Sequence, residues 1–293
     1  MKTIDLHVHS IYSDGEAFPK DLLAAAINKG LSVFSIADHN YISPEQSSIQ
    51  RIAEERGVLF IQGIEVSCMD REINKSLHIL GYSKHFNYSK INRKMLPIVE
   101  GYNIRAKKII SKLNKKYSAG LNYEEIKNET PSVCVSRNYL AKKLSDFMGG
   151  NFSPEELLSE IYIEEDNRWM PDVKEAIETI KKCNGMAILA HPGNLLDNDS
   201  FENLIKRLVG FGLEGIEVYT LKHSAMAIKK LKKIAEEYHL VMTAGSDWHG
   251  GKSLEGEERL EVSDKTYNQL SEIFRSEKKP LINRRLLPVH VSR

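Results

Sequence analysis

Apolar segments alternate with amphipathic ones along the chain, and this alternation limits the possible folds more than any other feature of the sequence. The segments that we expect to form strands are 3–9, 31–38, 58–66, 76–82, 186–191, 215–220 and 240–247. Several of them are followed by a helical pattern that ends in glycine, such as 19–30 and 43–57. Near-continuous apolar strands between amphipathic helices are typical of a parallel sheet covered on both faces. The sequence therefore predicts an α/β fold.

The strand pattern stops between residues 88 and 165, where only helical patterns occur. We expect helices over 91–117, 123–128, 136–147 and 153–162, and a last helix over 265–276. The two stretches with an α/β pattern, 1–87 and 166–293, would form one domain. Residues 88–165 would form a helical subdomain inserted into it.

Composition argues against a secreted or membrane-spanning protein. No secretory signal pattern is visible, and no apolar run reaches the length needed to span a bilayer. The three cysteines, Cys68, Cys134 and Cys183, are odd in number and far apart, which argues against a disulfide framework. These features predict a cytoplasmic protein with no membrane association.

The net charge of +1 hides a strong asymmetry. Residues 90–143 contain thirteen basic and four acidic side chains, so this stretch carries +9 while the rest of the chain carries −8. Such a stretch can be a solvated helical face. Alternatively, its positive field can attract an anionic substrate.

Side chains of the metal-binding type stand where the apolar strands end. They are His7, His9, Asp38, His39, Glu65, His78, His191, Glu217 and Asp247, with His249 two residues further on. Seven of the ten histidines lie at or just past a strand end, and only His85, His239 and His290 fall elsewhere. In a βα barrel the carboxyl ends of the strands carry the active site. Ligands gathered on this rim predict a metal centre.

The first strand shows how such a centre could be built. Because alternate residues of a strand share a face, His7 and His9 can reach the same ion. Imidazole and carboxylate ligands without thiolates suit Mn²⁺, Zn²⁺ or Fe²⁺. The ligands outnumber those that one ion needs, so two or three ions are expected, with Glu65 as a candidate bridge. Asp38, directly before His39, could orient an imidazole.

Seven motifs occur in the order in which they occur in one family of metal-dependent enzymes. They are DLHVHSIYSDG, FSIADHN, QGIEVS, LHILGY, AILAHPG, GIEVY with KHS, and TAGSDWHG, between residues 5 and 250. The chain thereby resembles the PHP (polymerase and histidinol phosphatase) family. The resemblance implies a distorted (βα)7 TIM-like barrel. It is strongest to members that act on nucleotides and carry a helical insertion after the fourth strand.

The resemblance also implies roles for single residues. One ion would be held by His7, His9 and Asp247, and a second by His78 and His191, with Glu65 bridging the two. A third would be held by Asp14, His39 and His249. Arg137, in SRNYLAKKL, would bind phosphate, and His223 would contact phosphate or act as a general acid; Asp247 would also belong to the catalytic set. Arg137 could instead be a surface arginine and His223 a structural residue, and relatives usually have histidine where this chain has Tyr139.

The expected activity is hydrolysis of a phosphate monoester of a nucleotide by attack of a metal-bridging hydroxide. The substrate would be a nucleoside 3′,5′-bisphosphate, a 5′-nucleotide or a short oligonucleotide, and no stable protein partner is expected. Three alternatives stay open: a histidinol-phosphate phosphatase, a metal-dependent amidohydrolase, and a PHP module without catalytic activity.

Overall fold

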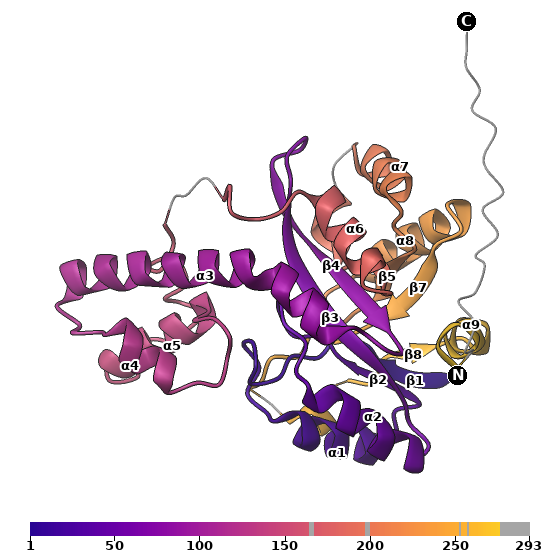
Figure 1. Cartoon of the computed structure of the whole chain (residues 1–293), viewed down its shortest axis with the longest axis horizontal. Coiled ribbons are helices and arrows are strands. Elements are labelled where there is room, and N and C mark those ends of the chain that lie inside the picture. Colours follow the sequence, from indigo (N-terminus) through magenta and orange to yellow (C-terminus); the bar gives the residue numbers. More distant parts are fainter. Residues whose placement is uncertain (164–166, 197–199, 252, 257, 276–293) are drawn as a thin grey trace, which may run out of the picture.

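The computed structural model describes residues 1–163, 167–196, 200–251, 253–256 and 258–275 (Figure 1). The strands are β1 (Lys2–Asp5), β2 (Val33–Ile36), β3 (Leu59–Asp70), β4 (Lys75–Ser83), β5 (Met186–Leu189), β6 (Gly215–Tyr219), β7 (Val241–Ala244) and β8 (Glu261–Val262). The α-helices are α1 (Pro19–Lys29), α2 (Glu45–Glu55), α3 (Tyr88–Tyr117), α4 (Tyr123–Asn128), α5 (Arg137–Phe147), α6 (Val173–Lys182), α7 (Phe201–Phe211), α8 (Ala225–Glu237) and α9 (Asp264–Arg275). Two short 3₁₀ helices are η1 (Pro192–Leu195) and η2 (Leu254–Gly256).

The strands form one sheet in the order β7-β6-β5-β4-β3-β2-β1-β8. Strands β1 to β3 are mutually parallel, as are β5 to β7, but β4 runs antiparallel to both β3 and β5. The prediction of a parallel sheet was therefore wrong at β4. The physical reason is the short turn at 71–74, because a parallel pair needs a crossover of a dozen or more residues.

The sheet curves round until the residues beyond β1 meet the end of β7. Leu6 N donates to the carbonyl oxygen of Ala244 at 2.9 Å, and Asp247 N donates to that of His7 at 2.8 Å. Val8 and Trp248 continue this contact as a parallel bridge. These bonds nearly close a barrel of the predicted type, to which the two-residue β8 adds an antiparallel edge next to β1.

The helix α3 extends from the barrel into the inserted segment (Figure 1). Its first half packs Ile91, Met95 and Ile98 into the core that contains β3 and β4. Its second half packs with α4 and α5 in a separate core, to which Ile109 and Leu113 contribute. We call α4, α5, the segment 153–163 and the second half of α3 the cap. The division of the chain at 88 and 165 stays a prediction, and residue 165 lies outside the described residues.

One predicted helix of the cap is absent. Within the predicted helix 153–162, residues 154–161 form consecutive turns in place of an α-helix, with bonds such as Leu158 N to Glu155 O (3.2 Å) and Glu160 N to Leu157 O (3.0 Å). So short a segment is marginal as a helix. Here the burial of Leu157 and Ile161 in the cap core fixes its path.

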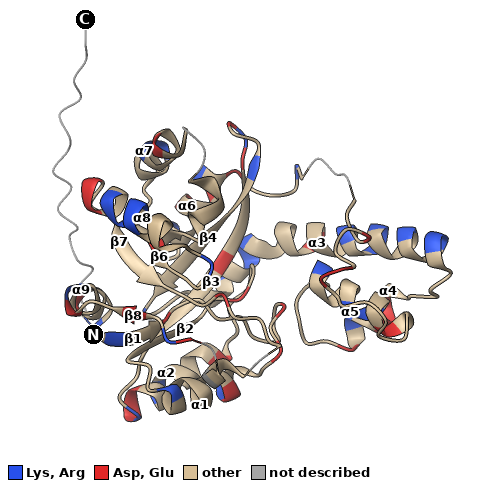
Figure 2. Ribbon diagram, turned by 180° about the vertical axis from the view of Figure 1, so that it is seen from behind, with Lys and Arg blue, Asp and Glu red and all other residues tan. Residues whose placement is uncertain are grey.

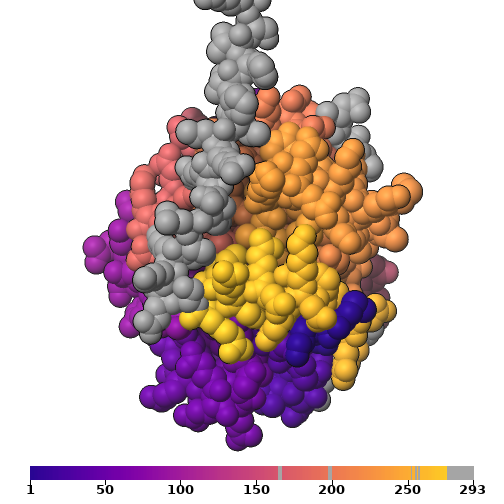
Figure 3. Space-filling model, turned by 90° about the vertical axis from the view of Figure 1, so that its right-hand side faces the viewer, coloured from indigo at the N-terminus to yellow at the C-terminus, as the bar shows by residue number. Residues whose placement is uncertain are grey.

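The helix α9 packs against the end of the barrel at which the parallel strands begin. Its Leu270 and Phe274 join a core formed by residues such as Val33 and Val241, which lie at strand starts. Figure 3 shows this helix, in yellow, beside the indigo N-terminal strand. Through the parts of the chain described above, no helix is both long and apolar enough to cross a membrane.

Candidate metal centre

The nine predicted ligands come together at one end of the barrel. Seven follow or end parallel strands or lie in the loops beyond them, namely His7, His9, Asp14, His39, His191, Asp247 and His249. Glu65 lies within the long strand β3, and its backbone forms an isolated parallel bridge with that of His39. His78 reaches the same rim because antiparallel β4 begins there, and Ala190 N donates to its carbonyl oxygen at 3.1 Å.

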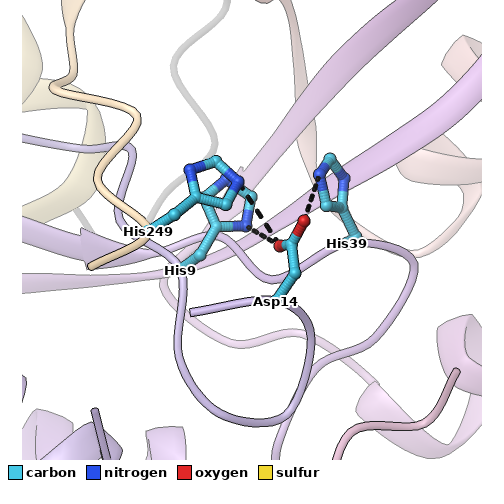
Figure 4. Close-up of side chains that lie close together, drawn as sticks. All are labelled: His9, Asp14, His39 and His249. Atoms are coloured by element: carbon cyan, nitrogen blue, oxygen red, sulfur yellow. Dashed lines mark ion pairs between the residues drawn. The ribbon is translucent and has the colours of Figure 1, made fainter. Parts of the chain in front are cut away.

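Three groups of ligand-type atoms arise from this convergence. They are His9, Asp14, His39 and His249; His7, Glu65, His191 and Asp247; and His39, Glu65 and His78, with the chosen atoms of each group within 4.8 Å of one another. Figure 4 shows the first group, in which the three imidazoles surround the carboxylate of Asp14. The Asp14 Oδ1 atom lies 3.5 Å from His9 Nδ1 and 3.4 Å from His249 Nε2.

Glu65 joins the second and third groups. Its side chain is fully buried, and each of its oxygen atoms faces different histidines. The Oε2 atom lies 3.2, 3.3 and 3.1 Å from ring nitrogens of His7, His9 and His39. The Oε1 atom lies 2.9 Å from His78 Nδ1 and 3.0 Å from His191 Nε2. This is the arrangement that a carboxylate bridging two ions requires.

The grouping differs in part from the one that the family resemblance implies. His191 lies with His7, Glu65 and Asp247, whereas the resemblance places it with His78 and the bridging Glu65, and His9 lies with Asp14. His9 is close to both groups, because its Nε2 is 3.2 Å from Asp247 Oδ1 while its Nδ1 faces Asp14. The metal position to which His9 belongs therefore depends on which of its two ring nitrogens binds an ion.

The chemistry of the donor set fits divalent metal ions. Five of the nine ligand residues carry a buried nitrogen or oxygen atom that has no hydrogen-bond partner: His7 Nε2, Asp14 Oδ1, His39 Nδ1, Glu65 Oε2 and His78 Nδ1. Leaving such groups unsatisfied is costly, so a site that collects them calls for a bound ion. Two atoms that each bind one ion at about 2.1 Å lie about 3.0–3.5 Å apart, which matches the separations around Glu65.

The electrostatics of the centre also favour positive charge. Burial would raise the pKa of Glu65, but His78, His7 and His39 hold it well below its usual range. Burial would lower the pKa of His9, yet the neighbouring carboxylates of Asp247, Glu65 and Asp14 raise it to about 10. Burial lowers the pKa of His39 to about 4.

Glu217 supports two of the candidate ligands; the sequence placed it among the side chains at the strand ends but gave it no individual role. Its Oε1 atom lies 3.1 Å from His7 Nδ1, and its Oε2 accepts a bond from His191 N at 2.7 Å. The backbone of His191 adopts a positive φ of 26°, a conformation that needs such support. The sequence signal for this role was a carboxylate on a predicted strand whose carboxyl end lies at the rim of the barrel.

Replacing Glu217 with glutamine is expected to lower metal affinity or activity about 10- to 100-fold. The amide keeps the size of the side chain but binds the imidazole of His7 less strongly. Metal titration followed by calorimetry checks this result. Glu214→Gln, which changes a partly exposed residue at the other end of β6, is the matched control. Equal metal affinity in the two variants would contradict the role of Glu217.

Asp38 supports the site in a way other than the one expected. Its carboxylate accepts bonds from Ser10 N and Ser10 Oγ, both at 2.7 Å, and from Ser13 Oγ at 2.6 Å, in place of binding an imidazole. Ser13 Oγ in turn lies 3.4 Å from His9 Nδ1. Asp38 therefore fixes the loop that carries Asp14.

His223 makes contacts that favour the structural alternative. Its Nδ1 donates to the carbonyl oxygen of Val218 at 2.9 Å, and its Nε2 accepts from Gly193 N at 3.0 Å. A Cβ atom on Gly193 would come within 2.5 Å of the imidazole ring. The histidine thus ties the loop after His191 to β6, and its neighbour Lys222 contacts the carboxylate of Asp247.

Two adjoining cavities separate the metal centre from the cap. The smaller, of about 140 Å³, is lined on the barrel side by residues such as Asp14, His39 and His78. Its cap side includes Arg137, to which the family resemblance gives a phosphate-binding role, and Arg105, which the sequence analysis did not single out. The larger cavity, of about 480 Å³, continues from Asp14 towards Asn138, Tyr139 and Lys142.

The geometry separates Asp14 from His7, and two alanine variants test this separation. Asp14→Ala is expected to lower the bound metal by one ion, because Asp14 belongs to one group only. His7→Ala is expected to release an ion from the group that contains Glu65 and Asp247. Metal analysis combined with Mn²⁺ paramagnetic resonance distinguishes the two losses. If both variants lost the same ion, this separation would be wrong.

A nearly closed α/β barrel with histidines and carboxylates on its rim defines a class of metal-binding barrel proteins. The chain belongs to the PHP domain family, whose family model matches residues 5–189. This confirms the family predicted from the motifs.

Several curated relatives and solved structures are similar to this chain. A phosphoribosyl 1,2-cyclic phosphate 1,2-diphosphodiesterase of Eggerthella lenta is 27% identical over 84% of this chain and 94% of the relative. A 5′-3′ exoribonuclease of Haemophilus influenzae is 28% identical, over 85% and 90%. A 3′,5′-nucleoside bisphosphate phosphatase of Chromobacterium violaceum is 27% identical, over 85% and 88%.

The solved structures support the barrel fold. A protein of Bifidobacterium adolescentis, assigned as a metal-dependent phosphoesterase, has a TM-score of 0.76 at 22% identity, covering 92% of this chain and 96% of the other. An amidohydrolase of Chromobacterium violaceum has a TM-score of 0.75 at 24% identity, with the same coverage.

Proposed function

We propose that this chain is a metal-dependent phosphoesterase that hydrolyses a phosphate monoester of a nucleotide. The observation that carries the proposal is the position of the small cavity. One wall consists of ligands grouped around the buried Glu65, and the opposite wall carries the guanidinium groups of the cap. Such a space suits a phosphate group between cations, and the three curated relatives described above are all named for reactions on phosphate esters.

Two or three divalent ions of Mn, Zn or Fe would occupy the three groups of ligands. When bound, such ions lower the pKa of a water molecule and offset the charge of a phosphoryl group. Glu65 would hold two of the positions at a fixed separation, and Asp14 would anchor the third. Glu217 would keep His7 in the orientation and tautomer that present its Nε2 to an ion.

The cap would select the substrate. Arg137 begins α5 and lines the small cavity, where its planar guanidinium can bind two phosphate oxygens. Exposed lysines follow one another along the second half of α3 (Figure 2), namely Lys107, Lys108, Lys115 and Lys116. They favour a substrate with more than one negative charge. The larger cavity offers space for a nucleoside beside Asn138 and Tyr139.

A phosphate-release panel with purified, Mn²⁺-loaded protein tests this function. The substrates are adenosine 3′,5′-bisphosphate, adenosine 5′-monophosphate, a 5′-phosphorylated oligoribonucleotide, ribose 1,2-cyclic phosphate 5-phosphate and histidinol phosphate. We expect the highest kcat/KM for a nucleotide or oligonucleotide. Faster release from histidinol phosphate would contradict the proposal, as would release of ammonia without phosphate from an amide substrate. His9→Ala, if folded, provides the inactive control.

We also propose that the enzyme works in the cytoplasm on small phosphorylated molecules. The three cysteines are free and buried, which suits a reducing compartment. A short oligonucleotide would reach the site along the basic cap.

A further inference from the structure

Lys222 reaches the metal centre from the loop between β6 and α8. Its Nζ atom contacts the Oδ2 atom of Asp247. The other oxygen of that carboxylate, Oδ1, lies 3.4 Å from His7 Nε2 and 3.2 Å from His9 Nε2. The two oxygens therefore have different surroundings, because Oδ1 faces imidazoles of the centre while Oδ2 faces the ammonium group.

The burial of Asp247 explains why its second oxygen needs a partner. The exposed fraction of this side chain is 7%, so water solvates it poorly. If Oδ1 binds an ion and Oδ2 has no partner, Oδ2 keeps most of the cost of its burial. The ammonium group of Lys222 supplies a charge-assisted hydrogen bond there. The lysine side chain is itself 60% exposed, so the pairing does not require burial of the whole lysine.

An irregularity in β6 prepares the loop that carries Lys222. The register between β6 and β7 shifts between Glu217 and Tyr219, which leaves Val218 as an extra residue. Irregularities of this kind re-aim the chain next to functional sites. The carbonyl oxygen of Val218 accepts a hydrogen bond from His223 Nδ1 at 2.9 Å, so the imidazole is tied to the strand at this point.

The loop is also fixed on both sides of Lys222. The backbone N of His223 donates to the carbonyl oxygen of Thr220 at 3.1 Å, which closes a turn with Lys222 as its third residue. Directly afterwards, Ser224 Oγ accepts from Ala227 N at 3.2 Å and caps α8. The lysine side chain therefore starts from a defined place on the rim. A lysine on a mobile loop would lose more conformational entropy on pairing with a carboxylate.

We propose that Lys222, held in place by His223, is a positioning residue that makes Asp247 bind metal through one oxygen only. With Oδ2 fixed by the ammonium group, Oδ1 stays directed to the position that Asp247 shares with His7, Glu65 and His191. Lys222 thereby raises the affinity of that position without touching the substrate. The inference rests on the divalent ions of the proposed function, but not on which ester the enzyme hydrolyses.

Lys222→Met tests this role, because methionine is of similar length and carries no charge. The dissociation constant of the ion that His7→Ala releases is expected to rise about 10- to 100-fold. The ion held by the group of Asp14 should stay bound. Mn²⁺ titration followed by calorimetry and paramagnetic resonance distinguishes the two positions. Lys222→Arg keeps a cation beside Asp247 and should recover most of the affinity. Lys229→Met, on an exposed position of α8, is the matched control.

Kinetics distinguish a positioning residue from one that touches the substrate. On the substrate identified by the phosphate-release panel, Lys222→Met should be slow at limiting Mn²⁺, and the lost activity should return as Mn²⁺ is raised to saturation. A kcat that stayed low with every position loaded would overturn the inference, because Lys222 would then act on the substrate itself. Equal Mn²⁺ affinity in Lys222→Met and Lys229→Met would overturn it as well.

His223→Ala tests the support of the loop. It should weaken the same ion, and adding it to Lys222→Met should lower the affinity little further, because both residues act through Asp247. Losses of affinity that simply added would overturn the role of His223 in holding Lys222. A wild type that bound Mn²⁺ but hydrolysed no ester would contradict the proposed function alone, since the affinity measurements would still decide this inference. A wild type that bound no Mn²⁺ would contradict both.

Discussion

Glu65→Gln is expected to lower kcat by at least about 10³-fold and to release metal from two positions. The carboxylate has an oxygen within 3.3 Å of a nitrogen of each of five histidines, and it is fully buried among them. Glutamine has nearly the same shape as glutamate. Its NH₂ group, however, would face imidazole nitrogens that need either a carboxylate oxygen or a bound metal ion opposite them. The loss should therefore exceed that of Glu217→Gln. Metal analysis and kinetics on the substrate found in the phosphate-release panel measure both effects.

A folded control is essential here, because a buried charge is removed. The far-ultraviolet circular dichroism of Glu65→Gln should match that of the wild type. Asp14→Ala serves as the comparison, since it should empty one position and keep the bridge. A Glu65→Gln protein that retained every ion would show that Glu65 does not bridge.

Removal of metal with a chelator is expected to abolish more than about 99% of the activity and to lower Tm by several degrees. The physical reason is that ions bind the folded centre and not the unfolded chain, which stabilises the fold by mass action. Without them, the buried carboxylates and the unpartnered atoms of His7, His39 and His78 lose their compensation. Differential scanning calorimetry of apo and holo protein measures the change in Tm.

Adding back single metals completes the experiment. Mn²⁺, Zn²⁺ and Fe²⁺ should each restore Tm, and the metal that restores the highest kcat identifies the active form. Chelator already saturated with Zn²⁺, which cannot remove the more weakly chelated Mn²⁺ or Fe²⁺, is the control for effects of the chelator itself. An unchanged Tm after complete removal would mean that the ions do not hold the centre together.

Most of the barrel could be predicted, because its strands are apolar segments bounded by polar residues or turns. The direction of β4 could not be read from those segments, since alternation of side chains is the same in either direction. A signal was present nonetheless: the predicted strands 58–66 and 76–82 are separated by too few residues for a parallel crossover. Applying that rule would have shown why His78, near the start of its strand, reaches the common rim.

Most of the candidate ligands were predictable for the same reason as the strands, because they stand at or just past the ends of apolar segments, whereas Glu65 lies within β3 and Asp14 lies in the loop after β1. The division of the ligands into three groups could not be predicted. It depends on the orientation of the His9 ring, which directs Nδ1 towards Asp14 and Nε2 towards Asp247. Arg105 was missed because its sequence neighbours form an ordinary amphipathic helix. Its guanidinium packs against the ring of Trp169, which lies more than sixty residues further along the sequence, so only the fold brings the two side chains together.

The helix α3 belongs to two hydrophobic cores, and this shared membership affects how the molecule opens. Ile91, Met95 and Ile98 should exchange their amide protons only when the barrel opens, whereas Ile109 and Leu113 should exchange when the cap alone opens. The change in protection should fall near Gly101 and Arg105, beside the small cavity. One continuous helix thus joins two cooperative folding units, and a ligand bound at their junction would make them open together.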